Sequence, residues 1–175
     1  MSKQTGEINK TQRILSIYHL FTQCEEVSMQ ELTSLLPGCS KTFSRDIALL
    51  KKSGVQVRYS VKLQAFVLSD IKRASPDLPE GLADKRYIKK IIRLISVMDG
   101  VPPEDCDIWY TQSIPGATKR TMQRDFTTLN SIGFCIKYER RSWNIHYTGV
   151  DVPPNRYYCD RPTDAYSLTT FKKRV

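Results

Sequence analysis

The octapeptide Thr118-Lys119-Arg120-Thr121-Met122-Gln123-Arg124-Asp125 carries the signals of a helix N-terminus. The hydroxyl of Thr118 can cap the helix. Met122 starts an apolar stripe that continues with Phe126 and Leu129, at spacings of four and three. The stretch therefore predicts an amphipathic helix, over about residues 117–131, whose outward face carries Lys119, Arg120, Gln123 and Arg124.

The outward face of this predicted helix has the chemistry of a DNA-reading surface. Arginine and lysine donate to guanine edges and bind phosphate, and glutamine can pair with adenine. In a helix-turn-helix, these contacts concentrate at the start of the second helix. The candidate DNA-binding residues here are Thr118, Lys119, Arg120, Thr121, Gln123 and Arg124.

The same phrase occurs earlier in the chain, as Ser40-Lys41-Thr42-Phe43-Ser44-Arg45-Asp46. At a constant offset of 79, Arg45 matches Arg124 and Asp46 matches Asp125. The register continues through Leu50 and Leu129, Gly54 and Gly133, and Tyr59 and Tyr138. Such a repeat indicates two copies of one small domain. The candidate DNA-binding residues of the first copy are Ser40, Lys41, Thr42, Ser44 and Arg45.

The first copy reads as three helices followed by a hairpin. Helices are predicted over about 10–23, from the N-cap Ser28 to about Leu36, and from Cys39 or Ser40 to Lys52. Strands are expected at 55–59 and 65–68, and Val27 could form a one-residue strand. This is the order of a winged helix, with Lys62 as the basic residue at the tip of the wing.

The second copy follows the same order. Helices are expected from Tyr87 to about Gly100, over Glu104–Gln112 with Pro103 in the first turn, and over 117–131. The wing strands are expected at 134–138 and 143–147, with Arg140 and Arg141 at the tip as further candidate DNA contacts. The predicted fold is α+β, mainly α, with two tandem winged helix-turn-helix domains.

The expected organisation has five parts: a flexible arm at 1–9, a first domain at 10–69, a linker at 70–85, a second domain at 86–149 and a C-terminal arm at 150–175. The linker contains Pro76, Pro79 and Gly81. Residues 150–175 do not repeat any earlier part of the chain. They read as an ordered arm on a partner or on their own domain, or as the start of a further domain.

Composition narrows the classes of function. The chain has 175 residues and a net charge of +9, which suits an anionic partner such as nucleic acid. No apolar run is long enough for a membrane helix. The five cysteines form no Cys-x-x-Cys pair, so neither a zinc site nor a disulfide framework is expected and a reducing cytoplasm fits best. Catalytic motifs are absent, and the chain is not expected to be an enzyme or to bind a cofactor.

The repeated phrase resembles a known family. The pattern Ser/Thr, Lys/Arg, Arg, Thr, an aliphatic residue, any residue, Arg, Asp, then Leu, Gly and a hairpin is similar to the winged helix-turn-helix of DeoR-type and WYL-domain bacterial transcription regulators. Residues 118–125 match every slot, whereas Cys39 stands at the cap slot of the first copy and Ser40 replaces a basic residue. The resemblance covers about residues 10–69 and 86–148, and it implies DNA binding with repression or activation.

Three functions follow from these observations. The leading hypothesis is a sequence-specific regulator of double-stranded DNA, with each third helix in a major groove and each wing on the backbone or minor groove. A homodimer would then read an inverted repeat. The alternatives are a plasmid or phage replication initiator that binds origin repeats, and a tandem winged-helix module that binds proteins. Asp46 and Asp125 are expected to be structural residues, because a carboxylate beside DNA is costly unless it orients an arginine or bonds a backbone amide. Tyr59 and Tyr138 are expected in the core or at its boundary with hydrogen-bonded hydroxyls, and DNA stacking is the alternative.

Overall fold

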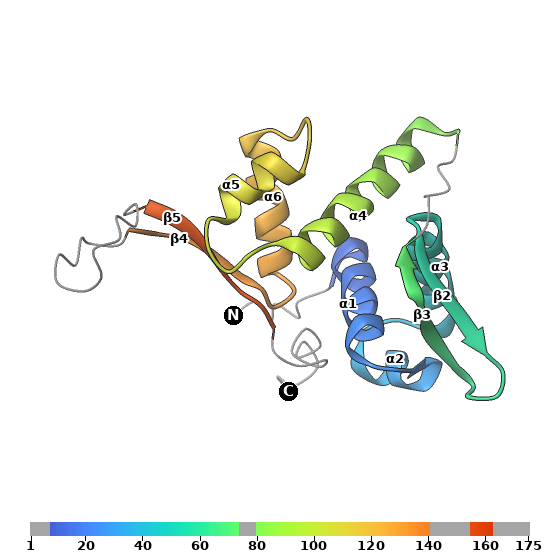
Figure 1. The fold of residues 1–175 in the computed structure, drawn as a ribbon. Coiled ribbons are helices and arrows are strands. Elements are labelled where there is room, and N and C mark those ends of the chain that lie inside the picture. The colour runs from blue at the N-terminus through green and yellow to red at the C-terminus, as the bar shows by residue number, and fades with distance from the viewer. Residues whose placement is uncertain (1–7, 74–79, 141–154, 163–175) are drawn as a thin grey trace, which may run out of the picture. The chain divides into compact units, whose positions relative to one another are not determined.

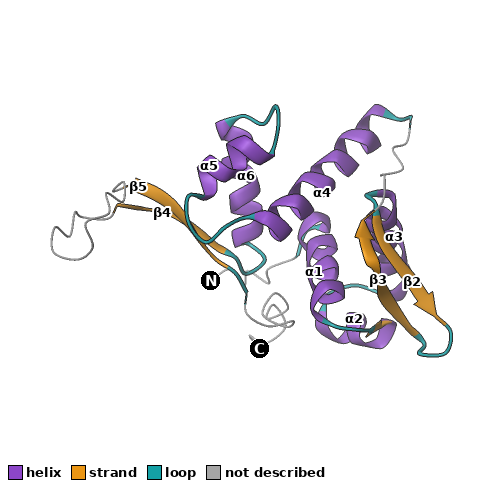
Figure 2. Ribbon diagram, viewed as in Figure 1, coloured by secondary structure: helices purple, strands orange, loops and turns teal. Residues whose placement is uncertain are grey.

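The computed structural model describes residues 8–73, 80–140 and 155–162 (Figure 1). This part of the chain is mainly helical, with short antiparallel sheets, which confirms the predicted α+β class (Figure 2). It forms two compact units, of which the first contains the chain up to Ile95 and the second spans Ser96–Arg161. None of the described helices is both long and apolar enough to cross a membrane.

The first unit opens with three helices whose ends agree with the sequence signals. α1 (Lys10–Gln23) starts at a capping box in which Asn9 Oδ1 accepts from the Gln12 amide at 3.0 Å. α2 (Met29–Leu35) starts at the predicted cap Ser28, which pairs reciprocally with Glu31. α3 (Ser40–Lys52) follows Pro37-Gly38 and ends before Gly54, which has φ +91°. Local capping and turn chemistry therefore set these boundaries.

A three-stranded sheet completes the first unit. Its antiparallel strands are β1 (Val27–Ser28), β2 (Val55–Ser60) and β3 (Ala65–Arg73), in the order β1-β3-β2. Val27 lies opposite Phe66, and Tyr59 is also opposite Phe66 on the other side of β3. The core between sheet and helices contains the buried residues Ile14, Ile17, Phe21, Leu32, Phe43, Ile47, Leu50 and Val57.

The helix α4 (Leu82–Gly100) starts earlier than predicted and spans the boundary between the two units. Its first half belongs to the first unit, where the hydroxyls of Tyr87 and Thr11 lie 3.2 Å apart. The expected linker at 70–85 is correspondingly shorter, because β3 continues to Arg73 and α4 begins at Leu82.

The second unit contains α5 (Cys106–Ser113), α6 (Lys119–Asn130), β4 (Cys135–Arg140) and β5 (Asn155–Asp160). α5 starts two residues later than predicted, so Pro103 precedes the helix instead of occupying its first turn. Asp105, at the N-cap, has φ +53° and makes no side-chain cap bond. Arg161 donates to the carbonyl groups of Asp99 and Val101, where α4 ends.

The partner of β4 differs from the prediction. β4 pairs with β5, whereas the predicted return strand at 143–147 lies outside the described residues. Tyr138 lies opposite Tyr157 just as Tyr59 lies opposite Phe66, so β5 has the register that β3 has in the first unit. Tyr59 and Phe66 are seven positions apart and Tyr138 and Tyr157 nineteen, so the second connection is longer by twelve. Residues 155–160, expected in a C-terminal arm, thus form a strand of the second unit.

Candidate nucleic-acid interface

The helix α6 begins as its sequence predicts. Thr118 is the N-cap, and its hydroxyl oxygen accepts from the Thr121 amide at 3.2 Å. Met122, Phe126 and Leu129 are buried, which fixes the rotation of the helix in the second unit. The outward face is then determined by the helical repeat, and it is the face that carries the basic residues.

The cations of α6 are exposed and have no protein partner in the described part of the chain. Lys119, Arg120 and Arg124 are exposed, as is Gln123 between them. None of these three cations makes an ion pair or a side-chain hydrogen bond with a described residue. Lys119 and Arg120 also stand in the first turn, where the helix dipole already favours an anion. This face can therefore donate to an external anion without breaking an internal contact.

The helix α3 repeats this arrangement residue for residue. Ser40, Lys41, Ser44 and Arg45 are exposed, at the positions equivalent to Lys119, Arg120, Gln123 and Arg124. Lys41 and Arg45 likewise make no ion pair with a described residue. The buried positions match as well: Phe43, Asp46, Ile47 and Leu50 in α3, and Met122, Asp125, Phe126 and Leu129 in α6. The two helices thus present the same face, with more donors on α6.

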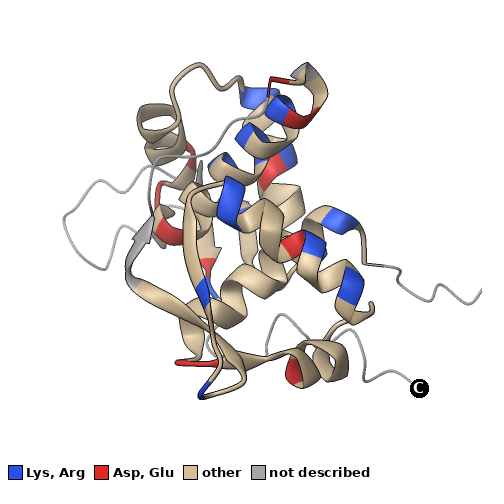
Figure 3. Cartoon of the chain, turned by 90° about the vertical axis from the view of Figure 1, so that its right-hand side faces the viewer, with Lys and Arg blue, Asp and Glu red and all other residues tan. Residues whose placement is uncertain are grey.

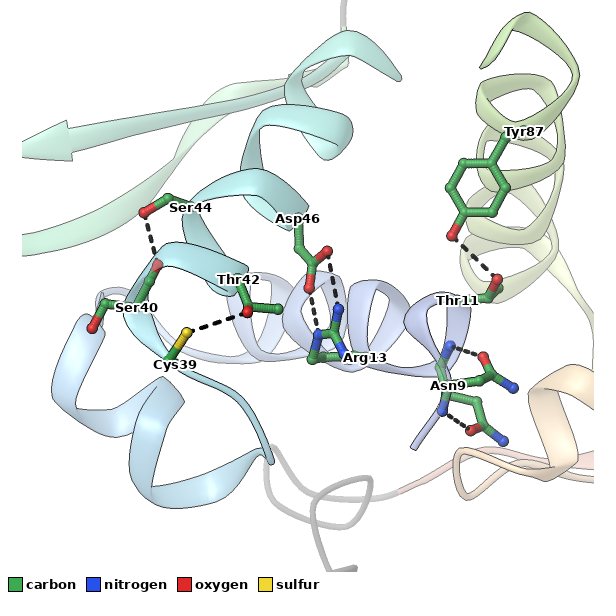
Figure 4. A network of polar contacts seen from close by, with 10 residues as sticks. Asn9, Thr11, Arg13, Cys39, Ser40, Thr42, Ser44, Asp46 and Tyr87 are labelled. Carbon is green, nitrogen blue, oxygen red and sulfur yellow. Dashed lines mark hydrogen bonds and ion pairs between the residues drawn. The ribbon is translucent and has the colours of Figure 1, made fainter. Parts of the chain in front are cut away.

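The candidate threonines Thr42 and Thr121 turn toward the helix caps. Thr121 Oγ1 lies 3.0 Å from Thr118 Oγ1. In α3, Thr42 Oγ1 lies 3.3 Å from Cys39 Sγ, as Figure 4 shows. Ser44, in turn, donates its hydroxyl to the Ser40 carbonyl oxygen at 2.9 Å. These three side chains support the first turns of the helices and are less available to a ligand than the neighbouring cations.

Cys39 gives the first helix a different cap. It occupies the N-cap of α3 but makes no side-chain hydrogen bond to the helix amides. The Thr42 hydroxyl hydrogen-bonds its sulfur, and this bond, together with nearby amides, lowers the pKa of the Cys39 thiol. The first turn of α3 is therefore less well capped than that of α6.

Two buried aspartates, Asp46 and Asp125, hold α3 and α6 from the buried side, and the sequence did not reveal their partners. Arg13 on α1 donates Nε to Asp46 Oδ2 at 2.5 Å and Nη2 to Oδ1 at 3.4 Å (Figure 4). Tyr110 on α5 donates its hydroxyl to Asp125 Oδ2 at 2.6 Å. The structural role expected for both aspartates is confirmed. The only local sign that Arg13 could pair with a buried carboxylate is its position next to the apolar stripe of the first helix.

The hairpin candidates are only partly described. Lys62 is exposed in the turn between β2 and β3, beside the exposed apolar residues Val61 and Leu63. Arg140 ends β4, but its side chain and the whole of Arg141 lie outside the described residues. The described structure thus places one basic side chain, that of Lys62, at a hairpin tip.

Tyr59 and Tyr138 differ from the expectation of hydrogen-bonded boundary residues. They are 51% and 50% exposed, and each packs its ring against the residue opposite, at 5.2 Å between ring centroids. No hydrogen bond of either hydroxyl to a described residue is present. They stabilise the hairpins by aromatic cross-strand contact instead.

Comparison with models of known protein families, with curated proteins and with solved structures finds no match to this chain. Among the described residues, no group of three or more His, Cys, Asp or Glu side chains is placed to hold a metal ion.

Proposed function

We propose that this chain is a sequence-specific double-stranded DNA-binding transcriptional regulator with two winged helix-turn-helix domains. The order of three helices and a hairpin supports the first domain, and the shared register of β4–β5 with β2–β3 supports the second. The observation that carries the proposal is the repeated outward face of α3 and α6, whose cations lack internal partners among the described residues.

The spacing on α6 suits base reading in a major groove. Arg120 and Arg124 are four residues apart, so they lie on one face about 6 Å apart along the axis. That is close to two steps of about 3.4 Å along a DNA strand. Each arginine can donate a bidentate pair to a guanine, and Gln123 can pair with an adenine between them. Lys119 suits a phosphate beside the groove.

The two helices are proposed to contribute unequally. α3 offers one arginine, Arg45, and short serines where α6 has Lys119 and Gln123. α6 would therefore supply most of the base discrimination, and α3 would supply phosphate contacts and a smaller part of the readout. One monomer would read an asymmetric site, because the two faces differ.

The charge of these faces argues against the alternative of a protein-interaction module. A protein-interaction module does not need exposed, unpaired arginines and lysines on α3 and α6. A DNA ligand does need them, because phosphate contacts supply much of the affinity. Figure 3 shows the lysines and arginines of the described chain in blue and the aspartates and glutamates in red.

The test is DNA binding by matched double variants. A duplex is selected from a random library with the wild-type chain, and its dissociation constant is measured by fluorescence anisotropy at fixed salt. We expect Arg120→Ala with Arg124→Ala to weaken binding about tenfold or more, since each bidentate contact is worth ~1–3 kcal/mol. Lys41→Ala with Arg45→Ala should weaken it less.

The control is Lys51→Ala with Lys52→Ala, which removes the same charge from the exposed far end of α3. A change of less than about threefold for the α6 pair, or one equal to that of the control, would refute base reading by α6. Failure of the wild-type chain to select or retain any duplex would refute the function itself.

A further inference from the structure

The first half of α4 carries a basic stripe that neither reading helix includes. Between residues 82 and 95 the chain has Lys85, Arg86, Lys89, Lys90 and Arg93 but a single carboxylate, Asp84. The stripe belongs entirely to the first unit. In Figure 3 the blue residues follow one another along this helix.

The stripe is placed opposite the buried face of the helix. Ile88, Ile91, Leu94 and Ile95 are buried, and the Tyr87 hydroxyl contacts Thr11 of α1 on that side. At about 100° per residue, the five cations fall within an arc of about 140° centred away from these residues. Asp84 falls on the apolar side of the same wheel and makes no ion pair with a described residue. The outward face of α4 is thus of one charge.

This crowding is unfavourable for the isolated helix. Lys85 and Lys89, Arg86 and Lys90, and Lys89 and Arg93 are like-charged pairs at a spacing of four, which destabilise a helix. Arg86 and Lys89 are exposed, and neither they nor Lys85 and Lys90 make an ion pair or hydrogen bond with a described side chain. For these four cations, the described contacts of the fold give no internal reason.

The equivalent helix of the first repeat has no such stripe. On α1 the basic residues are Lys10, whose Nζ lies 5.0 Å from the Tyr87 ring centroid, and Arg13, which is paired with Asp46. Most of the remaining α1 residues are buried. A helix at this place in the repeat therefore does not require the cations, which points to an external anionic partner.

We propose that the outward face of α4, with Arg86 and Lys89 at its centre, is a phosphate-binding surface for the backbone of duplex DNA. This inference rests on the proposed function and adds a third contact region to it. Point charges along a helix face follow a phosphate row without reading bases. The stripe therefore contributes affinity equally to specific and non-specific duplexes, and it contributes to the salt dependence.

The test measures the salt dependence of binding for Arg86→Ala with Lys89→Ala. Each phosphate contact contributes about 0.9 to the slope of log K against log salt. We expect the variant to reduce the magnitude of that slope by about 1.8. It should also weaken binding to the selected duplex and to an unrelated duplex by the same factor. Lys51→Ala with Lys52→Ala is the charge-matched control.

A second measurement separates a binding role from a structural one. Without DNA, removal of the like charges should leave the melting temperature at low salt unchanged or raise it, because alanine favours the helix. A lowered melting temperature would mean that the cations serve the fold, and would overturn the proposal.

Three DNA results decide the matter. An unchanged slope in a variant whose wild-type parent binds duplex overturns the α4 surface alone. A loss of affinity for the selected duplex alone would mean that the stripe reads bases, and would overturn the proposal that it binds the DNA backbone. No duplex binding by the wild-type chain, with Arg86- and Lys89-dependent binding to phosphatidylserine vesicles, would overturn both proposals in favour of a membrane surface.

Discussion

The helices α3 and α6 have the same pattern of buried and exposed residues, but different chemistry holds each in place. In the first unit the buried Asp46 is paired with a guanidinium from α1. In the second unit the buried Asp125 accepts from a tyrosine hydroxyl of α5. Both aspartates are 1% exposed. The comparison indicates that the position requires a satisfied carboxylate, whereas the donor and the helix that supplies it are interchangeable.

The difference matters because the two anchors respond differently to loss of the donor. A buried carboxylate that loses its only charged partner is left uncompensated, which is costly. A carboxylate that loses one of several hydrogen bonds loses less. Asp125 has an interaction besides the one with Tyr110. The first unit should therefore be the more sensitive of the two.

The largest effect is expected for Arg13→Met. This change keeps the length of the side chain but leaves Asp46 buried without its counter-ion, at a cost of about 3–5 kcal/mol. Urea denaturation at neutral pH, followed by far-ultraviolet circular dichroism, measures the loss. The double variant Arg13→Met with Asp46→Leu removes both charges and should recover most of the stability. Equal instability of the single and double variants would contradict the ion-pair account.

A smaller loss is expected for Tyr110→Phe. The ring and its edge-on contact with Phe126, at 5.6 Å between centroids, are kept, so the change isolates the hydroxyl. We expect a loss of about 1–3 kcal/mol. Trp109 lies beside Tyr110 in α5, so its fluorescence reports on the unit that contains Tyr110. A cost larger than that of Arg13→Met would reverse the comparison.

The ends of α1, α2 and α3 could be predicted because local chemistry determines them. Asn9 and Ser28 form capping boxes with residues three positions on, and Gly54 adopts the left-handed backbone that ends α3. The outward faces of α3 and α6 were predictable for a related reason. Once Phe43 or Met122 is assigned to the core, the helical repeat determines which neighbours face solvent.

The donors to the buried aspartates of α3 and α6 could not be predicted from local patterns. Arg13 and Asp46 are 33 positions apart, and Tyr110 and Asp125 are 15 apart. The partner of β4 was missed for another reason. Trp143–Tyr147 alternates like a strand and is close to β4 in sequence, and short hairpin connections are the common case. β5 lies farther along the chain, and its identity emerges only from its register.

The helix caps offer the next comparison, at a smaller magnitude. Thr118→Ala removes the side-chain acceptor at the start of α6 and should cost about 1 kcal/mol. Cys39→Ser supplies an acceptor that α3 lacks, and should stabilise the first unit by up to about 1 kcal/mol. Thermal melts of both variants against wild type check the signs. Destabilisation by Cys39→Ser would mean that the thiol has a packing role that outweighs capping.

The smallest effect concerns the reactivity of Cys39, which is the N-cap of α3, as Thr118 is the N-cap of α6. The Thr42 hydroxyl lowers the pKa of the Cys39 thiol, so the thiolate form is present at lower pH than in a chain without that hydroxyl. Alkylation requires the thiolate, and its rate rises with pH through the pKa. In Thr42→Val, which keeps the shape but removes the donor, this rise should move to higher pH.

Mass spectrometry of the peptide that contains Cys39, after timed iodoacetamide treatment across a pH series, measures the midpoint of this rise. Thr42→Ser keeps a hydroxyl and should behave like the wild type. Identical midpoints in wild type and Thr42→Val would show that the Cys39–Thr42 contact does not perturb the thiol. A wild-type midpoint in Thr42→Ser would show that the hydroxyl at position 42 sets the reactivity of Cys39. The equivalent hydroxyl in α6, that of Thr121, contacts Thr118.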